Sequence, residues 1–212
     1  SLLFNYAQPL HHMGIRMNYP VSDQVGLGLF LVNGWNNPTD NNTGKTAGVS
    51  LTLKPKSDVT AIANFMIGPE QTANNDNMRH AFDVVLMYTL TPKLSLMGNY
   101  DWVHEKDAAG AGTGTQAVQG VAGYLKFQVN DMLAIGPRLE YLSDSDGVST
   151  GGAQKLKDVT MTVDLKHKDG VRLLIEYRRD MSDVNAWTDK NATPVNHQDT
   201  LSFGLVYAFG MN

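Results

Sequence analysis

The chain has 212 residues, a formal net charge of −4 at pH 7 and no cysteine. This length suits one sizeable domain, the missing cysteine excludes disulfides, thiolate metal sites and cysteine nucleophiles, and the mild acidity argues against a nucleic-acid-binding protein. No stretch approaches the ~18 consecutive apolar residues of a transmembrane helix, whereas a membrane β-barrel is compatible with a mean hydropathy just below zero, because its apolar residues alternate with polar ones.

Apolar and polar residues alternate with a period of two along almost the whole chain, which predicts β-strands rather than helices. The first predicted strand, 14–19, follows a segment, 1–7, whose sequence SLLFNYA makes a poor full strand. The later strands are predicted at 25–31, 47–53, 59–67, 82–90, 94–102, 121–129, 133–141, 158–166, 171–178 and 200–209. This makes about eleven strands of about 9–13 residues, and a tilted strand of about 9–11 residues crosses a hydrocarbon layer of ~30 Å.

The connections between these strands alternate strictly between short and long. The short turns are predicted at 20–23, 55–58, 91–93, 130–131 and 168–170. The long polar loops are predicted at 33–45, 69–79, 105–115, 143–153 and 183–198. An up-and-down barrel with tight turns on one rim and large loops on the other has this pattern, whereas a Greek-key sandwich would scatter its loop lengths. No useful helical stretch separates the strands, which excludes βαβ folds.

The two ends of the chain indicate an incomplete barrel. Residues 1–5 lack the basic start and apolar core of a secretory signal, so we expect either that a signal was removed or that the chain is a piece of a longer protein. The last strand ends on Phe209 and runs in the same direction as the strand at 13–19. An even strand number then needs a partner rising through 1–7. The sequence therefore predicts that 1–212 is a single all-β, antiparallel, up-and-down transmembrane β-barrel domain of about 11–12 strands that lacks N-terminal strands.

In a membrane barrel the apolar residues face lipid and the alternate residues line the lumen. The predicted lumen residues are Arg16, Asn64, Asp83, Asn99, Asp101, Lys126, Arg138, Glu140, Asp158, Asp164, Lys166, Arg172, Glu176, Arg178 and Asp180. A field across a pore sets ion preference, and we therefore expect a selectivity region of arginines beside carboxylates. Its predicted pore-lining residues are Arg138, Glu140, Asp164, Lys166, Arg172, Glu176 and Arg178. The alternative is that these charges form neutralised salt-bridge ladders that stiffen the wall.

Aromatic residues are placed as an interface belt would place them. Most lie on the apolar face near strand ends, and they are Tyr19, Tyr88, Tyr100, Trp102, Tyr141, Tyr177, Tyr207 and Phe209. Trp35 and Trp187 fall in long loops instead. We expect them to pack within those loops, and the alternatives are a place in the pore mouth or contact with sugar or lipid headgroups.

Enzyme motifs are weak, and no catalytic residue, metal site or cofactor is predicted. Gly44-Lys45-Thr46 ends like a phosphate-binding loop, but Thr39 stands where the first glycine belongs. The sequence DSDG at 144–147 has calcium-like spacing without the downstream glutamate of an EF-hand, so a solvated turn is expected. An outer-membrane hydrolase site would need residues on neighbouring strands, and the local pairs to test are His80 with Asp83 and His104 with Asp101.

Several stretches resemble one family. Residues 12–19 lead into PVSD at 20–23, NGWNN follows at 33–37 and DNNTGK at 40–45, and the hairpin YTLTPKLSLMGNY spans 88–100. Together they resemble the OmpL-like beta-barrel porins (porin-2 family) of Gram-negative bacteria, over most of the chain. The resemblance implies an outer-membrane diffusion channel without a cofactor, in proteins that look longer than this chain. It implies no substrate and no catalytic residues.

The sequence thus predicts a porin of the bacterial cell outer membrane, through which small hydrophilic solutes or ions diffuse passively along a charged lumen. Its expected partners are outer-membrane lipid and those solutes, with no nucleic acid, and a homo-oligomer or an envelope protein partner would also fit. The first alternative is a plugged structural or partner-binding outer-membrane barrel. The second is an outer-membrane hydrolase.

Overall fold

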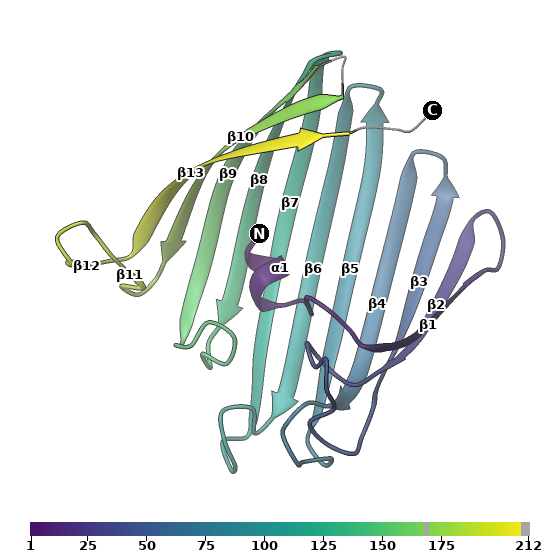
Figure 1. The fold of residues 1–212 in the computed structure, drawn as a ribbon, viewed down its shortest axis with the longest axis vertical. Coiled ribbons are helices and arrows are strands. Elements are labelled where there is room, and N and C mark those ends of the chain that lie inside the picture. Colours follow the sequence, from purple (N-terminus) through teal and green to yellow (C-terminus); the bar gives the residue numbers. More distant parts are fainter. Residues whose placement is uncertain (168–169, 209–212) are drawn as a thin grey trace.

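The computed structural model describes residues 1–167 and 170–208 and shows a strongly curved antiparallel sheet (Figure 1). Within the described residues the sheet has eleven strands, and almost every strand pairs with its neighbours in sequence, in the order β1 to β10 and then β13. The predicted all-β, up-and-down architecture is therefore confirmed. The sheet itself is open, because no pairing joins β1 to β13 within the described part of the chain.

The strands are 7 to 16 residues long. Their bounds are β1 Gly14–Pro20, β2 Val25–Val32, β3 Thr46–Lys56, β4 Val59–Pro69, β5 Met78–Thr91, β6 Leu94–Lys106, β7 Thr115–Asn130, β8 Leu133–Asp144, β9 Gln154–Lys166, β10 Val171–Ser182 and β13 His197–Tyr207. A small hairpin of β11 Trp187–Thr188 and β12 Pro194–Val195 lies in the long loop before β13. Every predicted strand thus has an observed counterpart, and most observed strands extend further.

The short and long connections gather at opposite ends of the sheet, as predicted (Figure 1). The tight turns lie at the upper end in that view, and the long loops lie at the lower end. The predicted turn at 168–170 falls partly on residues outside those described, as does Phe209. Strands that run toward the tight turns therefore alternate with strands that run toward the long loops.

The alternation of residues sorts the two faces of the sheet as expected for a membrane barrel. Large apolar side chains are exposed on the outer face, for example Leu29, Val121 and Leu139. Polar side chains such as Asp101 and Asp158 are buried on the inner face, 1% exposed each. A sheet with apolar residues outside and charges inside is the reverse of a soluble core. The outward tyrosines at 19, 88, 100, 141, 177 and 207 belong to the exposed apolar set, although Tyr100 and Tyr177 lie in the middle of their strands rather than near an end.

The first residues of the chain form a short helix, α1 Leu2–Tyr6, on the inner face of the sheet. It lies against β7 and β8, inside the curve of the sheet (Figure 1). The expectation that 1–7 would make a poor strand is confirmed, while the helix itself was not predicted. Among the described residues, no helix has the length and apolar character needed to cross a membrane.

Two neighbouring valines at the middle of β5 test this assignment of faces. Val84 faces outward and Val85 faces inward, where it lines a cavity. Val84→Arg should lower the free energy of unfolding by about 2–4 kcal/mol, because a charge near the bilayer centre faces hydrocarbon. Val85→Arg should cost about 1 kcal/mol or less, because its charge reaches water. Denaturant unfolding in phospholipid vesicles measures both, and equal losses would contradict the assignment.

Candidate functional site

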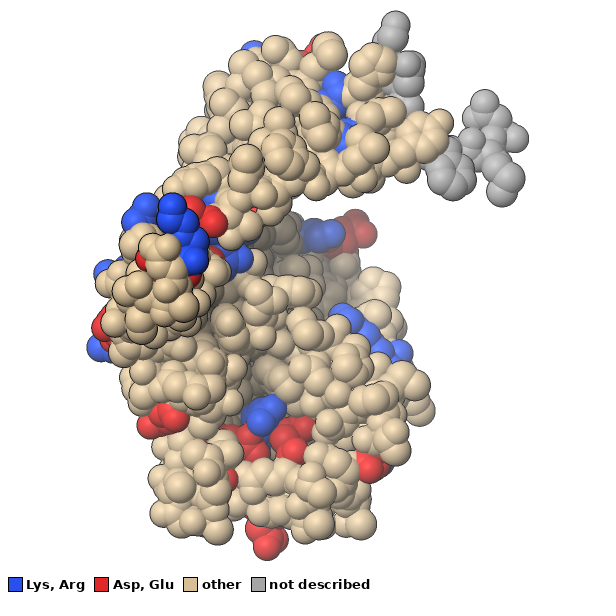
Figure 2. Space-filling view, turned by 60° about the vertical axis from the view of Figure 1, so that its left-hand side comes forward, with Lys and Arg blue, Asp and Glu red and all other residues tan. Residues whose placement is uncertain are grey.

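The inner face of the sheet borders two cavities. One, of about 670 Å³, lies along β1 to β6 and includes Arg16, Asn64, Asp83 and Asp101 in its lining. The other, of about 480 Å³, lies along β5 to β10 and includes Lys126, Arg138, Asp164 and Arg172. Several of the predicted lumen residues therefore line half-open cavities on the concave side. Figure 2 shows charged side chains in a few clusters, separated by broad uncharged surface.

Strand register brings two arginines of the predicted set to either side of one threonine. Thr160 on β9 pairs with Arg138 on β8 and with Arg178 on β10. Arg138 Nη2 donates to Thr160 Oγ1 at 2.9 Å. Like charges placed side by side in a sheet repel each other, so this row of cations needs compensation from a neighbouring row.

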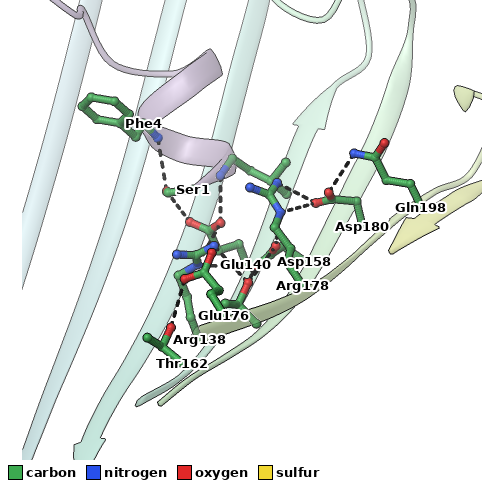
Figure 3. Close-up of polar contacts among 12 residues, drawn as sticks. Ser1, Phe4, Arg138, Glu140, Asp158, Thr162, Glu176, Arg178, Asp180 and Gln198 are labelled. Carbon is green, nitrogen blue, oxygen red and sulfur yellow. Dashed lines mark hydrogen bonds and ion pairs between the residues drawn. The ribbon is translucent and has the colours of Figure 1, made fainter. Parts of the chain in front are cut away.

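The next row along the same three strands supplies carboxylates. Asp158 pairs with Glu140 on one side and with Asp180 on the other. One oxygen of Asp158 lies 3.3 Å from Arg138 Nε and the other lies 2.7 Å from Arg178 Nε, while Arg178 Nη2 contacts Asp180 at 2.6 Å (Figure 3). Asp158 thus bridges both arginines. These contacts match the salt-bridge ladder that the sequence left open as the alternative.

A second ion pair lies closer to the short turns and is more open. Both nitrogens Nε and Nη2 of Arg172 donate to Asp164 at 2.6 Å, in a fork-to-fork geometry. The Arg172 side chain is 42% exposed, against 15% for Arg138 and 19% for Arg178. Lys166 pairs with Arg172 in the register and puts a second cation beside it. Cationic side chains accessible from the lumen therefore concentrate here.

The two remaining predicted residues have specific partners. Glu176 accepts a hydrogen bond from Thr162 Oγ1 at 2.9 Å (Figure 3). Glu140 lies underneath α1, where it accepts hydrogen bonds from the Ser1 hydroxyl at 2.5 Å and the Leu2 backbone N–H at 2.8 Å. The structure brings Glu140 together with Arg138 and Arg178 and leaves the pair of Arg172 and Asp164 separate.

The adjacent strands β5 and β6 carry two inward carboxylates without a cationic partner. Asp83 accepts hydrogen bonds from Asn64 at 2.5 Å and from Asn99 at 2.7 Å. Asp101 accepts from the side-chain amide of Gln8 at 3.1 Å. Among the described residues, neither carboxylate has a Lys or Arg nitrogen within 4.0 Å. The inner face thus has unpaired carboxylates on β5 and β6 and a mixture of cations and carboxylates along β7 to β10.

Two of the long loops place a tryptophan toward the inner face, at the end of the sheet that carries the long loops. The guanidinium of Arg79 lies over the Trp35 ring, 5.2 Å from its centre, and Trp35 lines both the large cavity and a smaller one beside it. Trp187, in the β11–β12 hairpin, packs against the apolar cluster around α1. In the same hairpin, backbone N–H groups of Thr193 and Asn191 hold the pKa of Asp189 below its usual value. Trp35 therefore lies at the pore mouth, and Trp187 contacts the wall.

The local pairs tested for hydrolytic chemistry do not form. His80 and His104 pair across β5 and β6 and stack on the outer face, 4.5 Å between ring centres. Asp83 and Asp101 point to the inner face, so the sheet separates each histidine from its predicted partner. The part of the chain that the structure describes also contains no group of three His, Asp or Glu side chains able to hold a metal.

Sequence reasoning missed α1 and the Gln8 contact. A signal was present: four inward positions on β7 to β9 are apolar or small where their neighbours are polar, namely Val118, Ala122, Leu142 and Leu156. Such a break in the alternation indicates that another segment covers the wall at that point.

Comparisons with known proteins agree with this architecture. The family model described as "Putative beta-barrel porin-2, OmpL-like" matches residues 1–209. The chain is similar in structure to the NanC porin, with a TM-score of 0.54 and 12% identity, over 92% of this chain and 91% of that one. It is also similar to OmpT, an outer membrane protein of Vibrio cholerae, with a TM-score of 0.61 and 15% identity, over 90% of this chain and 61% of OmpT. At these identities the shared feature is the fold. No curated protein matches the sequence.

Removing the charge that bridges the two arginines should destabilise the wall. Asp158→Asn removes the carboxylate that contacts both Arg138 and Arg178 and leaves them with Glu140 and Asp180 as partners, and it should lower the free energy of unfolding by about 3 kcal/mol. The control is Asp164→Asn, which should cost about 1 kcal/mol or less because its partner Arg172 reaches water. Denaturant titration of the refolded variants measures both. A similar loss for the two variants would show that Asp158 contributes no more to the free energy of unfolding than Asp164 does.

Proposed function

The chain belongs to the OmpL-like beta-barrel porin-2 family, which makes it an outer-membrane porin of Gram-negative bacteria, and we propose that small hydrophilic solutes and ions diffuse through its charged lumen. One observation carries this proposal: the inner face concentrates buried and half-buried charges, while the outer face is apolar. Charges are costly in a dry core but stable along water. Diffusion of this kind needs no cofactor and no energy source.

We assign the selectivity region to Arg138, Glu140, Asp164, Lys166, Arg172, Glu176 and Arg178. Exposure separates their roles. Arg172 and Lys166 are the ones that meet solutes, because Arg172 keeps the largest exposed fraction of the arginines in the set. Arg138 and Arg178 are paired with Asp158, Glu140 and Asp180, so these buried residues mainly stiffen the wall.

The acidic part of the wall lies beside a part of mixed charge, because β6 pairs with β7. Asp83 and Asp101 lie on β5 and β6, whereas Lys126, Lys166 and Arg172 lie on β7, β9 and β10. Charges of opposite sign on neighbouring parts of the wall produce a field inside the channel, which orients dipolar solutes and adjusts ion preference. We infer that this field and the lumen width together determine what passes.

The closed barrel, we propose, contains at least one strand more than the eleven described. Because β1 and β13 are the first and the eleventh strand of an alternating series, they run in the same direction. Unpaired backbone groups that face lipid cost several kcal/mol each. A strand of opposite direction between β1 and β13 would form hydrogen bonds with both open edges and remove this cost. The even strand numbers of bacterial barrels support an additional strand.

The position of α1 favours one alternative function, a plugged barrel that serves as a structural or partner-binding protein. The helix lies inside the lumen and is held there by buried contacts. Conductance in a planar bilayer separates a plugged barrel from an open channel. A partner, either another copy or an envelope protein, would then be sought only for a non-conducting barrel.

Two arginines of β10 provide a matched test of the open channel. Arg172 faces the lumen and Arg179 faces outward, and both side chains are 42% exposed. Arg172→Gln should shift the reversal potential in a KCl gradient toward cation preference, because it removes a lumen cation. Arg179→Gln should leave that potential unchanged. An insulating parent protein would contradict the diffusion channel and support the plugged barrel, and equal shifts would contradict the assigned lining.

A further inference from the structure

An apolar patch interrupts the charged inner wall. Its members come from three adjacent strands and are 0–3% exposed, namely Val118, Ala122, Leu142 and Leu156. Exposed to a water-filled lumen, such a patch would cost roughly 25 cal/mol for every Å² left uncovered. Its low exposure therefore depends on whatever covers it.

The cover is the segment that contains α1. Leu2, Leu3 and Ala7 form one cluster with the wall patch and are 0–3% exposed themselves. Gly120, in the wall beneath, leaves space for this contact, because a Cβ added there would lie 2.9 Å from Leu3 Cδ1. Phe4, on the same helix, points away and is 53% exposed. One face of α1 thus fits the wall, while the other faces the lumen.

Polar contacts fasten the two ends of this segment to carboxylates on either side of the patch. At one end, Glu140 on β8 receives the Ser1 hydroxyl and the Leu2 backbone N–H. At the other end, the Gln8 amide donates to Asp101 on β6 at 3.1 Å and to Asn99 at 3.2 Å. Both carboxylates are nearly inaccessible, with Glu140 5% and Asp101 1% exposed. The segment therefore spans the wall from β8 to β6 and covers a carboxyl group at each end.

We propose that residues 1–8 form a lumen cover that narrows the channel and hides Glu140 and Asp101 from passing ions. The effect of the cover on transport rests on the proposed diffusion function. The docking of residues 1–8 on the wall is independent of that function. Releasing the cover exposes two carboxylates and widens the lumen. The released channel conducts more and prefers cations more strongly, since fixed negative charge draws cations into a narrow aqueous passage.

Thiol labelling tests the docking without reference to transport. The chain has no cysteine, so Ala122→Cys introduces a single thiol, at a wall position that is 1% exposed. A membrane-impermeant maleimide should label it slowly in the otherwise unchanged protein. Adding Leu3→Gln should raise the labelling rate by about tenfold or more, because the loss of a buried leucine shifts the docking equilibrium by that order.

Two controls accompany this measurement. Adding Phe4→Gln to Ala122→Cys makes the same kind of change on the exposed side of the helix, and it should leave the rate unchanged. Ser95→Cys, on the inner face away from α1, should react at the same rate with and without Leu3→Gln. Fast labelling of Ala122→Cys before release, or no effect of Leu3→Gln, overturns the cover.

Single-channel recording then tests the consequence for transport. Leu3→Gln should increase conductance and move the reversal potential toward cations, and Phe4→Gln should do neither. Both substitutions are uncharged, so any new selectivity comes from wall carboxylates. Unchanged conductance and selectivity in Leu3→Gln, with its labelling raised, overturn the transport role of the cover. A non-conducting parent with the expected labelling pattern supports the docking and overturns the diffusion function instead.

Discussion

A strand that separates lipid from water must present opposite chemistry on successive residues, and the rest of this structure depends on that constraint. Because side chains alternate across a strand, eleven strands that obey the rule make one apolar surface and one charged surface. The same constraint explains the loops, since strands that all cross one layer must turn back alternately at its two faces. It also explains an average hydropathy that resembles a soluble protein, because the two faces cancel.

The charged inner face raises a second problem, which the register solves. Alternation places charges inward but does not choose their neighbours, and here it lines up Arg138 with Arg178 and Glu140 with Asp158. Each such row would repel itself. Stability comes from the diagonal contacts between rows, in which Asp158 gives one oxygen to each arginine. Arg172 has no second row of charged residues beside it, so its paired charge stays open to water. Wall stiffness and solute contact therefore belong to different members of one predicted set.

This separation marks the limit of what the sequence could predict. The period of two was sufficient for the strands, the loop pattern and the inward set, because each depends on local alternation alone. Which carboxylate meets which arginine depends on register, which the turns and bulges fix, for example the shift between Gln128 and Asn130. The helix α1 escaped prediction because five residues carry almost no periodic signal. The separation of His80 from Asp83 was implicit in their odd spacing, which puts them on opposite faces of one strand.

Departures from the alternation are therefore as informative as the alternation itself. On β7, Val118 and Ala122 face inward although the same strand carries Val121 outward, so this stretch is apolar on both faces. Exposing these apolar side chains to lumen water is unfavourable, so a second segment must cover them. The apolar pair Leu2 and Leu3 supplies that second segment, in a part of the chain that is too short and too irregular to be a strand. In a water-filled barrel, a cluster of inward apolar residues that is almost fully buried thus indicates a docked segment.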